Sequence, residues 1–166
     1  GMPDLVKSLA LLRQRGADFR CTLVGDGPQL GLVRAMVEES GLEDRVDLPG
    51  PLPQEQVREH FQGADLFILP CVQAPDGDMD GIPVAYMEAM ALGVPVIGTT
   101  VSGIPELIVE GESGLLVPPG NPQALAGGVA ILRDADLRPA LASIIQPTLV
   151  LHGERDTLAP PAAAEY

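Results

Sequence analysis

Apolar residues along the chain follow two alternating spacings, and each spacing predicts a different element. Residues 3–14 carry leucines at helical spacing, which predicts an amphipathic helix that ends near Gly16. Residues 66–69 form a short continuous apolar run, typical of a parallel strand that is buried on both faces. The same alternation predicts further helices at 28–41, 54–61, 84–92 and 122–133 and further strands at 19–25, 46–48, 94–98 and 114–117. This order of elements predicts an α/β fold with a mainly parallel sheet.

Composition is typical of one globular domain. The 166 residues are 46% hydrophobic and 20% charged, which is enough apolar content for a core. No run approaches the roughly 18 apolar residues that a membrane span requires, and the start lacks the basic and apolar segments of a signal peptide. We therefore expect a cytoplasmic protein without a membrane span. Its two cysteines, Cys21 and Cys71, are expected to be reduced and buried.

Charge narrows the classes of ligand. The formal net charge of −13 argues against binding to nucleic acid or to anionic membranes, because both depend on Lys and Arg. None of the ten basic residues lies between Arg58 and Arg133. An anionic ligand bound there would rely on backbone N–H groups and helix dipoles, each contributing on the order of 1 kcal/mol or less.

The segment 80–91 combines an acidic, glycine-containing loop with the start of a helix. Unpaired N–H groups in the first turn of a helix favour a phosphate. The carboxylates of Asp80 and Glu88 would not bind phosphate, but they accept hydrogen bonds from hydroxyl groups. This combination predicts a ligand that is part phosphate and part polyol, such as a nucleotide sugar.

Several motifs occur in an order that resembles one enzyme family. They are Val24-Gly25-Asp26-Gly27-Pro28, Ala64-Asp65-Leu66-Phe67-Ile68-Leu69-Pro70, Glu88-Ala89-Met90-Ala91, Gly93-Val94-Pro95-Val96-Ile97, Ser102-Gly103-Ile104-Pro105-Glu106 and Gly114-Leu115-Leu116-Val117-Pro118-Pro119-Gly120. Together they resemble the donor-binding half of family 4 glycosyltransferases of the GT-B fold, over residues 1–142. The resemblance implies a Rossmann-like three-layer αβα sandwich. It also implies retaining transfer of a sugar from a UDP-, GDP- or ADP-sugar to an acceptor hydroxyl, with no essential metal or other cofactor.

The same resemblance implies a role for each acid of the loop. Glu88 would bind the ribose hydroxyls and Asp80 would contact the donor sugar. Asp80 replaces the Glu that is usual in the family, so its carboxylate reaches less far. The backbone of the segment Gly81-Ile82-Pro83 would approach the sugar and the phosphates.

Two further pairs of residues resemble the nucleotide side of the family's site. Gly25 and Gly27 would form the tight strand-to-helix turn that borders the nucleotide. Gly50 and Leu52 would lie where the family packs the base against backbone and apolar atoms. An ordinary loop is the alternative for the second pair.

The resemblance leaves out parts of the family enzyme. The family's donor domain opens with a central strand and a turn whose Arg and Lys hold the donor phosphates, and an acceptor-binding domain precedes it. The resemblance starts after both. For the chain alone we therefore expect a truncated donor domain with weak nucleotide binding and no turnover. A folded, noncatalytic remnant is the competing interpretation.

Residues 143–166 depart from this family. The run from Pro147 to Asp156 resembles a late strand of α/β-hydrolases, in which Asp156 would belong to a catalytic triad. No Gly-x-Ser-x-Gly motif occurs and no His follows Asp156, so the triad cannot form within the chain. We expect the strand 148–152 to fill the missing central position of the sheet, which would bring Arg155 toward the donor phosphates. Homodimerisation is the alternative if that position is not filled.

A calcium site is a second interpretation of the acidic loop. Asp76, Asp78 and Asp80 match the start of an EF-hand loop, D-x-D-x-D-G. The twelfth position should be Glu but is Met87, and Glu88 comes one residue late. The prediction is therefore a weak calcium loop at best.

A further local prediction concerns Ser102, which is expected to cap a short helix with its side chain.

Overall fold

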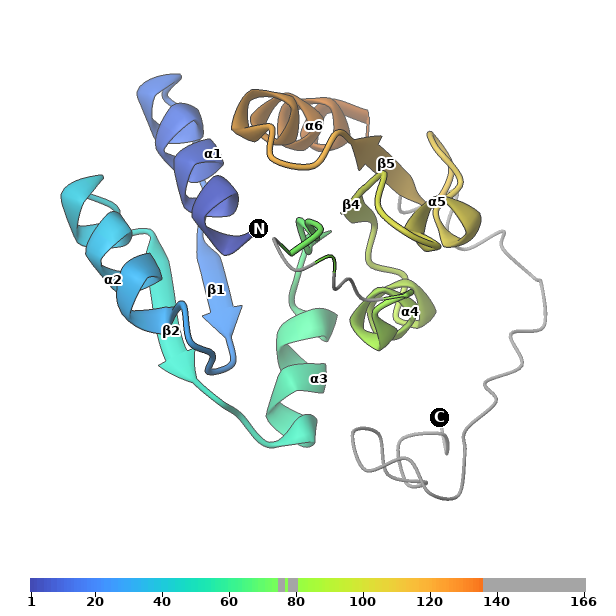
Figure 1. Ribbon diagram of the computed structural model, residues 1–166, viewed down its shortest axis with the longest axis horizontal. Helices are drawn as coiled ribbons and strands as arrows, with labels where there is room; N and C mark the ends of the chain where they lie inside the picture. The colour runs from blue at the N-terminus through green and yellow to red at the C-terminus, as the bar shows by residue number, and fades with distance from the viewer. Residues whose placement is uncertain (75–76, 78–80, 136–166) are drawn as a thin grey trace.

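The computed structural model describes residues 1–74, 77 and 81–135. Helices and strands alternate along this part of the chain (Figure 1). Their bounds are α1 Met2–Gln14, β1 Cys21–Val24, α2 Leu30–Glu39, β2 Val46–Gly50, α3 Gln54–Gln62, β3 Phe67–Ile68, α4 Val84–Ala91, β4 Val96–Thr99, α5 Ile104–Leu107, β5 Gly114–Val117 and α6 Pro122–Ala135. The α/β fold with parallel strands predicted from the sequence is confirmed.

The strands form two parallel groups. β1 pairs with β2, and β3, β4 and β5 form a second sheet in that order. From β1 the chain moves outward to β2, and from β3 it moves outward in the other direction to β5 (Figure 1). The strand 148–152, which we expected between these two groups, lies outside the described residues, as does the whole segment 143–166.

Helices cover both faces of the strands and create two apolar cores. α1, α2 and α6 lie on one face, whereas α3, α4 and α5 lie on the other (Figure 1). Neighbouring strand residues alternate between these cores: Ile97 packs in the first and Val96 in the second, and both are fully buried. This alternation follows from the twofold repeat of a strand. The arrangement is the three-layer αβα sandwich predicted from the sequence.

The first turn of α1 links the two strand groups. Gly1 is the N-cap of this helix, and its backbone packs so tightly on Pro70 that a Cβ at Gly1 would lie 1.5 Å from the carbonyl oxygen of Pro70. Residues 15–20 then return the chain from the end of α1 to the start of β1, so helix and strand run in opposite directions. The carboxyl end of β1 therefore lies at the same edge of the molecule as Pro70, which follows β3.

Two local predictions need correction. α2 begins at Leu30 rather than at Pro28, because residues 28 and 29 form a turn in which the Leu30 N–H donates to the carbonyl oxygen of Gly27 over 2.9 Å. The short helix expected after Ser102 is α5, Ile104–Leu107, but Ser102 does not cap it. Its φ is +50°, and the backbone of Gly103 occupies the N-cap position without a side-chain hydrogen bond.

The two cysteines are less buried than expected. Cys21 and Cys71 are free thiols, and each is half-buried at the margin of an apolar core.

Among the helices of the described residues, none has the length and apolar content needed to span a membrane.

Candidate functional site

Gly25 and Gly50 meet at the carboxyl ends of β1 and β2. The Gly25 N–H donates to the carbonyl oxygen of Gly50 over 2.9 Å, and the register of the two strands shifts at this point. Both residues have positive φ, +123° for Gly25 and +81° for Gly50, which favours glycine. The sequence placed these two glycines on the same ligand, and the structure places them in direct contact.

Gly27 and Leu52 flank this pair of glycines. Gly27 is exposed in the turn before α2, and no atom lies within 4 Å of the position that a Cβ there would occupy. Leu52 is half-buried in the link between β2 and α3. This corner therefore offers open backbone and one half-buried apolar side chain.

α4 starts directly after the segment Gly81-Ile82-Pro83, with Pro83 as its N-cap. The first turn is open to solvent, since Val84 is 47% exposed and Ile82 is 38% exposed. Val84 and Glu88 are four residues apart and therefore share one face of the helix, on which Glu88 is half-buried. The opposite face buries Tyr86 and Ala89 completely. The helix thus presents a carboxylate one turn behind an exposed N-terminus.

Two side chains hold the chain that leaves β3 at the same edge. The Tyr86 hydroxyl, from α4, donates to the carbonyl oxygen of Leu69. Thr99, at the end of β4, donates from Oγ1 to the carbonyl oxygen of Cys71 over 2.7 Å. Burial raises the pKa of the Tyr86 phenol above its ordinary range, so the hydroxyl stays protonated and remains a donor. These two contacts hold residues 69–71, which follow β3, against α4 and β4.

Of the two acids at the centre of the prediction, Glu88 is described and Asp80 is not. Asp76 and Asp78 also lie outside the described residues, and so does Arg155. The roles given to them from the sequence stay predictions. Within the described residues no cluster of three or more His, Cys, Asp or Glu side chains could hold a metal ion.

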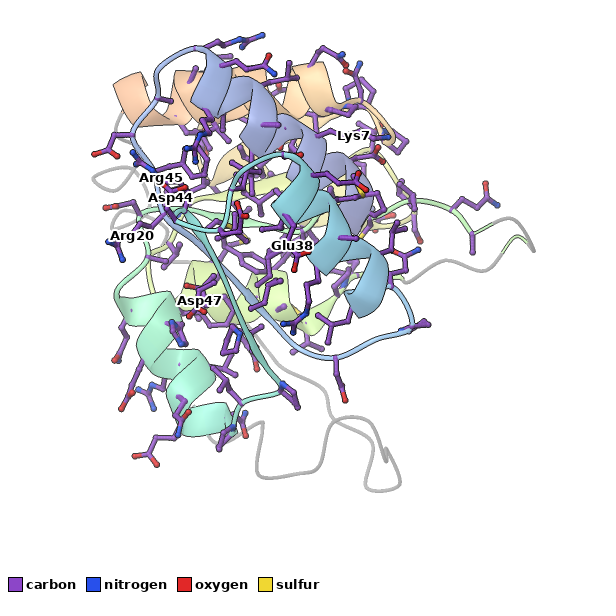
Figure 2. All side chains as sticks on the ribbon, turned by 90° about the vertical axis from the view of Figure 1, so that its left-hand side faces the viewer. Lys7, Arg20, Glu38, Asp44, Arg45 and Asp47 are labelled. Atoms are coloured by element: carbon purple, nitrogen blue, oxygen red, sulfur yellow. The ribbon has the colours of Figure 1, made fainter. Side chains whose placement is uncertain are left out.

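Several cations gather at the other edge of the strands. Arg45 precedes β2 and pairs with Asp18 and, at 3.4 Å, with Asp44. Arg13, near the end of α1, donates to Asp44 over 2.5 Å. Figure 2 shows Asp44 and Arg45 side by side where the chain enters β2, with Arg20 below them. The hydrogen bond from Arg13 lowers the pKa of the Asp44 carboxyl. These charged side chains therefore lie at the amino ends of the strands, opposite the edge that carries Gly25 and Gly50.

Sequence reasoning missed the roles of Tyr86, Thr99 and Gly103 at the carboxyl ends of the strands, although Gly103 stands in one of the quoted motifs. Each acts through a contact with a segment that is distant in the sequence, so no local spacing identifies it. Only Tyr86 could have been singled out from the sequence, because aromatic residues make up just 3% of this chain.

The profile of the family Glycosyl transferases group 1 matches residues 1–134. The chain belongs to this family. Across 143 residues it is 42% identical to the amylovoran biosynthesis glycosyltransferase AmsK of Erwinia amylovora. The aligned region covers 85% of this chain and 35% of AmsK. It is 34% identical, also over 143 residues, to a GDP-mannose-dependent alpha-(1-6)-phosphatidylinositol monomannoside mannosyltransferase of Mycolicibacterium smegmatis, covering 86% of this chain and 37% of the relative.

Solved structures agree with this family. The crystal structure of Anabaena HepE in complex with UDP-glucose superposes with a TM-score of 0.72 and 27% identity, over 86% of this chain and 38% of HepE. The fold is therefore the Rossmann-like GT-B type predicted from the sequence. The chain spans about a third of the length of the curated relatives AmsK and the mannosyltransferase.

Proposed function

We propose that this chain is the donor-binding part of a retaining glycosyltransferase and that it holds a nucleotide-diphosphate sugar at the carboxyl ends of its strands. One observation carries the proposal: the exposed N-terminus of α4 follows Gly81-Ile82-Pro83, and the half-buried Glu88 lies on the same face of the helix one turn later. Backbone N–H groups and a carboxylate suit the two halves of such a donor.

Each predicted residue has a role in this proposal. Glu88 accepts hydrogen bonds from the ribose hydroxyls, and Asp80 contacts the donor sugar. The backbone of residues 81–83 approaches the sugar and the diphosphate. Gly25 and Gly27 border the nucleotide, while Gly50 and Leu52 contact the base.

The chemistry would be transfer of the sugar to an acceptor hydroxyl with retention of configuration. The diphosphate that leaves must be stabilised, and the N–H groups and dipole of α4 supply part of that stabilisation. Cationic side chains would have to supply the rest. Arg155 is one candidate, and the acceptor-binding domain of the longer relatives is the partner that completes the site.

Two bases are the leading candidates for the donor. The mycobacterial relative is named as dependent on GDP-mannose, and HepE was crystallised with UDP-glucose. ADP-sugars complete the set to be tested, because base contacts through glycine backbone and Leu52 do not select one base strongly.

Calorimetric titration tests the proposal. UDP, GDP, ADP and their sugar conjugates are titrated into the full 166-residue chain, and calcium alone is titrated separately. We expect saturable, metal-independent binding of one nucleotide, which Glu88→Ala removes. Glu112→Ala is the matched control, because Glu112 is an exposed acid in the turn before β5.

The other outcomes identify the alternatives. A folded chain that binds none of these nucleotides would be a noncatalytic remnant of the donor domain, and the proposal would be wrong. Heat released by calcium alone, and lost in Asp78→Asn, would instead assign the acidic loop to a weak calcium site.

A further inference from the structure

Gly103 makes an unusually close contact with the segment ahead of α4. A Cβ at Gly103 would lie 2.9 Å from Cγ1 and 3.2 Å from Cδ1 of Ile82, and 4.0 Å from the carbonyl oxygen of Gly81. Cγ1 is attached to the branched Cβ of Ile82, where side-chain rotation is restricted. A side chain at Gly103 would therefore displace the segment 81–83 itself, and not merely the tip of a flexible side chain.

Backbone conformation does not require glycine at this position. The φ and ψ of Gly103 are −81° and −1°, values that any L-residue adopts. The requirement for glycine comes from the space that Ile82 occupies. This separates Gly103 from Gly25 and Gly50, whose positive φ values explain them without any neighbour.

The turn that carries Gly103 is held firmly. Val101 and Ile104 are buried on either side of it, and the Ile104 N–H donates to the carbonyl oxygen of Val101 over 3.2 Å. Ser102 has a left-handed φ of +50°, a conformation that persists in a non-glycine residue when its surroundings determine it. Gly103 is thus a fixed surface, and Ile82 rests on it.

We infer that Gly103 is a positioning residue for the donor site: its bare backbone sets where the segment Gly81-Ile82-Pro83 stands and so where α4 presents its N-terminus to the donor diphosphate. The inference rests on the proposed function for its ligand, a nucleotide-diphosphate sugar. The position of the segment can be measured without that ligand.

The experiment combines Gly103→Ala with Ile82→Ala in a double-mutant cycle on the full chain. Hydrogen exchange of the Tyr86 amide is the first measurement, because this N–H donates to the carbonyl oxygen of Pro83 over 3.1 Å and so reports on the segment 81–83. Calorimetric affinity for the nucleotide sugar is the second. Gly127→Ala is the matched control, since Gly127 lies within α6 and no atom lies within 4 Å of its Cβ position.

We expect Gly103→Ala to accelerate exchange of the Tyr86 amide at least fivefold and to weaken donor binding at least tenfold. In the Ile82→Ala background the same change should cost less than twofold in each measurement, because the atoms it would strike are gone. Gly127→Ala should alter neither measurement. If Gly103→Ala alone fails to fold, folding of the double variant would support the inference.

Two results would overturn it. One is exchange of the Tyr86 amide that stays at the wild-type rate in Gly103→Ala. The other is an equal cost of Gly103→Ala in both Ile82 backgrounds. If the wild-type chain binds no nucleotide, the proposed function fails, and the exchange measurement still decides the role of Gly103.

Discussion

Oγ1 of Thr99 donates a hydrogen bond to the carbonyl oxygen of Cys71 over 2.7 Å, and Thr99 is only 1% exposed. Thr99→Val removes this hydrogen bond and keeps the shape of the side chain. We expect the free energy of unfolding to fall by about 1 kcal/mol, the usual net contribution of a hydrogen bond. Urea denaturation measures this, with Thr100→Val as the control, because Thr100 is its exposed neighbour. Equal stability of the two variants would contradict the role given to Thr99.

Alanine at Gly25 or at Gly50 should destabilise the corner where β1 and β2 end. Each residue has a positive φ, and an L-residue in the left-handed region costs roughly 1–2 kcal/mol. Gly31→Ala is the opposite case, because Gly31 lies inside α2 and alanine there should stabilise by about 0.5–1 kcal/mol. Thermal melting of the three variants gives the comparison. A rise in Tm for Gly25→Ala would rule out the backbone argument.

Stability should depend on pH through Cys21. Burial raises the pKa of its thiol to about 11, from an ordinary value of 9.0. Between these values the unfolded chain has lost the proton and the folded chain keeps it. The contribution of Cys21 to the free energy of unfolding is therefore fully present below pH 9. It is lost as the pH rises toward 11. Denaturation at several pH values should show a smaller fall in Cys21→Ala. An identical fall in that variant would mean that Cys21 does not contribute.

The predicted strand 148–152 is tested by proline. A strand placed between β1 and β3 would follow β5 and α6, and α6 lies on the same face as α2. The connection from β5 through α6 to this strand would run across the strands in the same direction, and on the same face, as the connection from β1 through α2 to β2. Both crossovers would therefore be right-handed. Val150→Pro would remove a ladder hydrogen bond and should lower Tm by several degrees. Ala163→Pro, in the same segment, should not. Equal Tm values would show that the segment does not complete the sheet.

Local patterns were enough to predict most elements. α4 was expected at 84–92 and covers Val84–Ala91, and β5 was expected at 114–117 and covers those residues. Their signals, helical spacing and a continuous apolar run, lie within the segments themselves. Pro28 misled the prediction for α2, because proline suits a turn as well as the first turn of a helix.

Motifs led to the glycines and acids that we propose for the site, but they did not reveal the contacts that hold these segments in place. Gly103 touches Ile82 across 21 positions, and Thr99 reaches Cys71 across 28. Contacts of this kind depend on how two loops meet after the strands have aligned. No spacing of residues within either loop predicts these contacts, so they can be identified only from the structure.

The first apolar core includes Val46 of β2, Ile97 of β4 and Val117 of β5, and α1 and α6 contribute Leu9 and Leu125 to it. One cluster therefore spans both groups of strands. Neither group can tilt away from the other without exposing that cluster to water. The cluster therefore fixes the distance between the corner at Gly50 and the helix α4. Replacing Leu125 by a smaller side chain would then loosen both halves of the proposed donor site at once, although Leu125 is buried in the core.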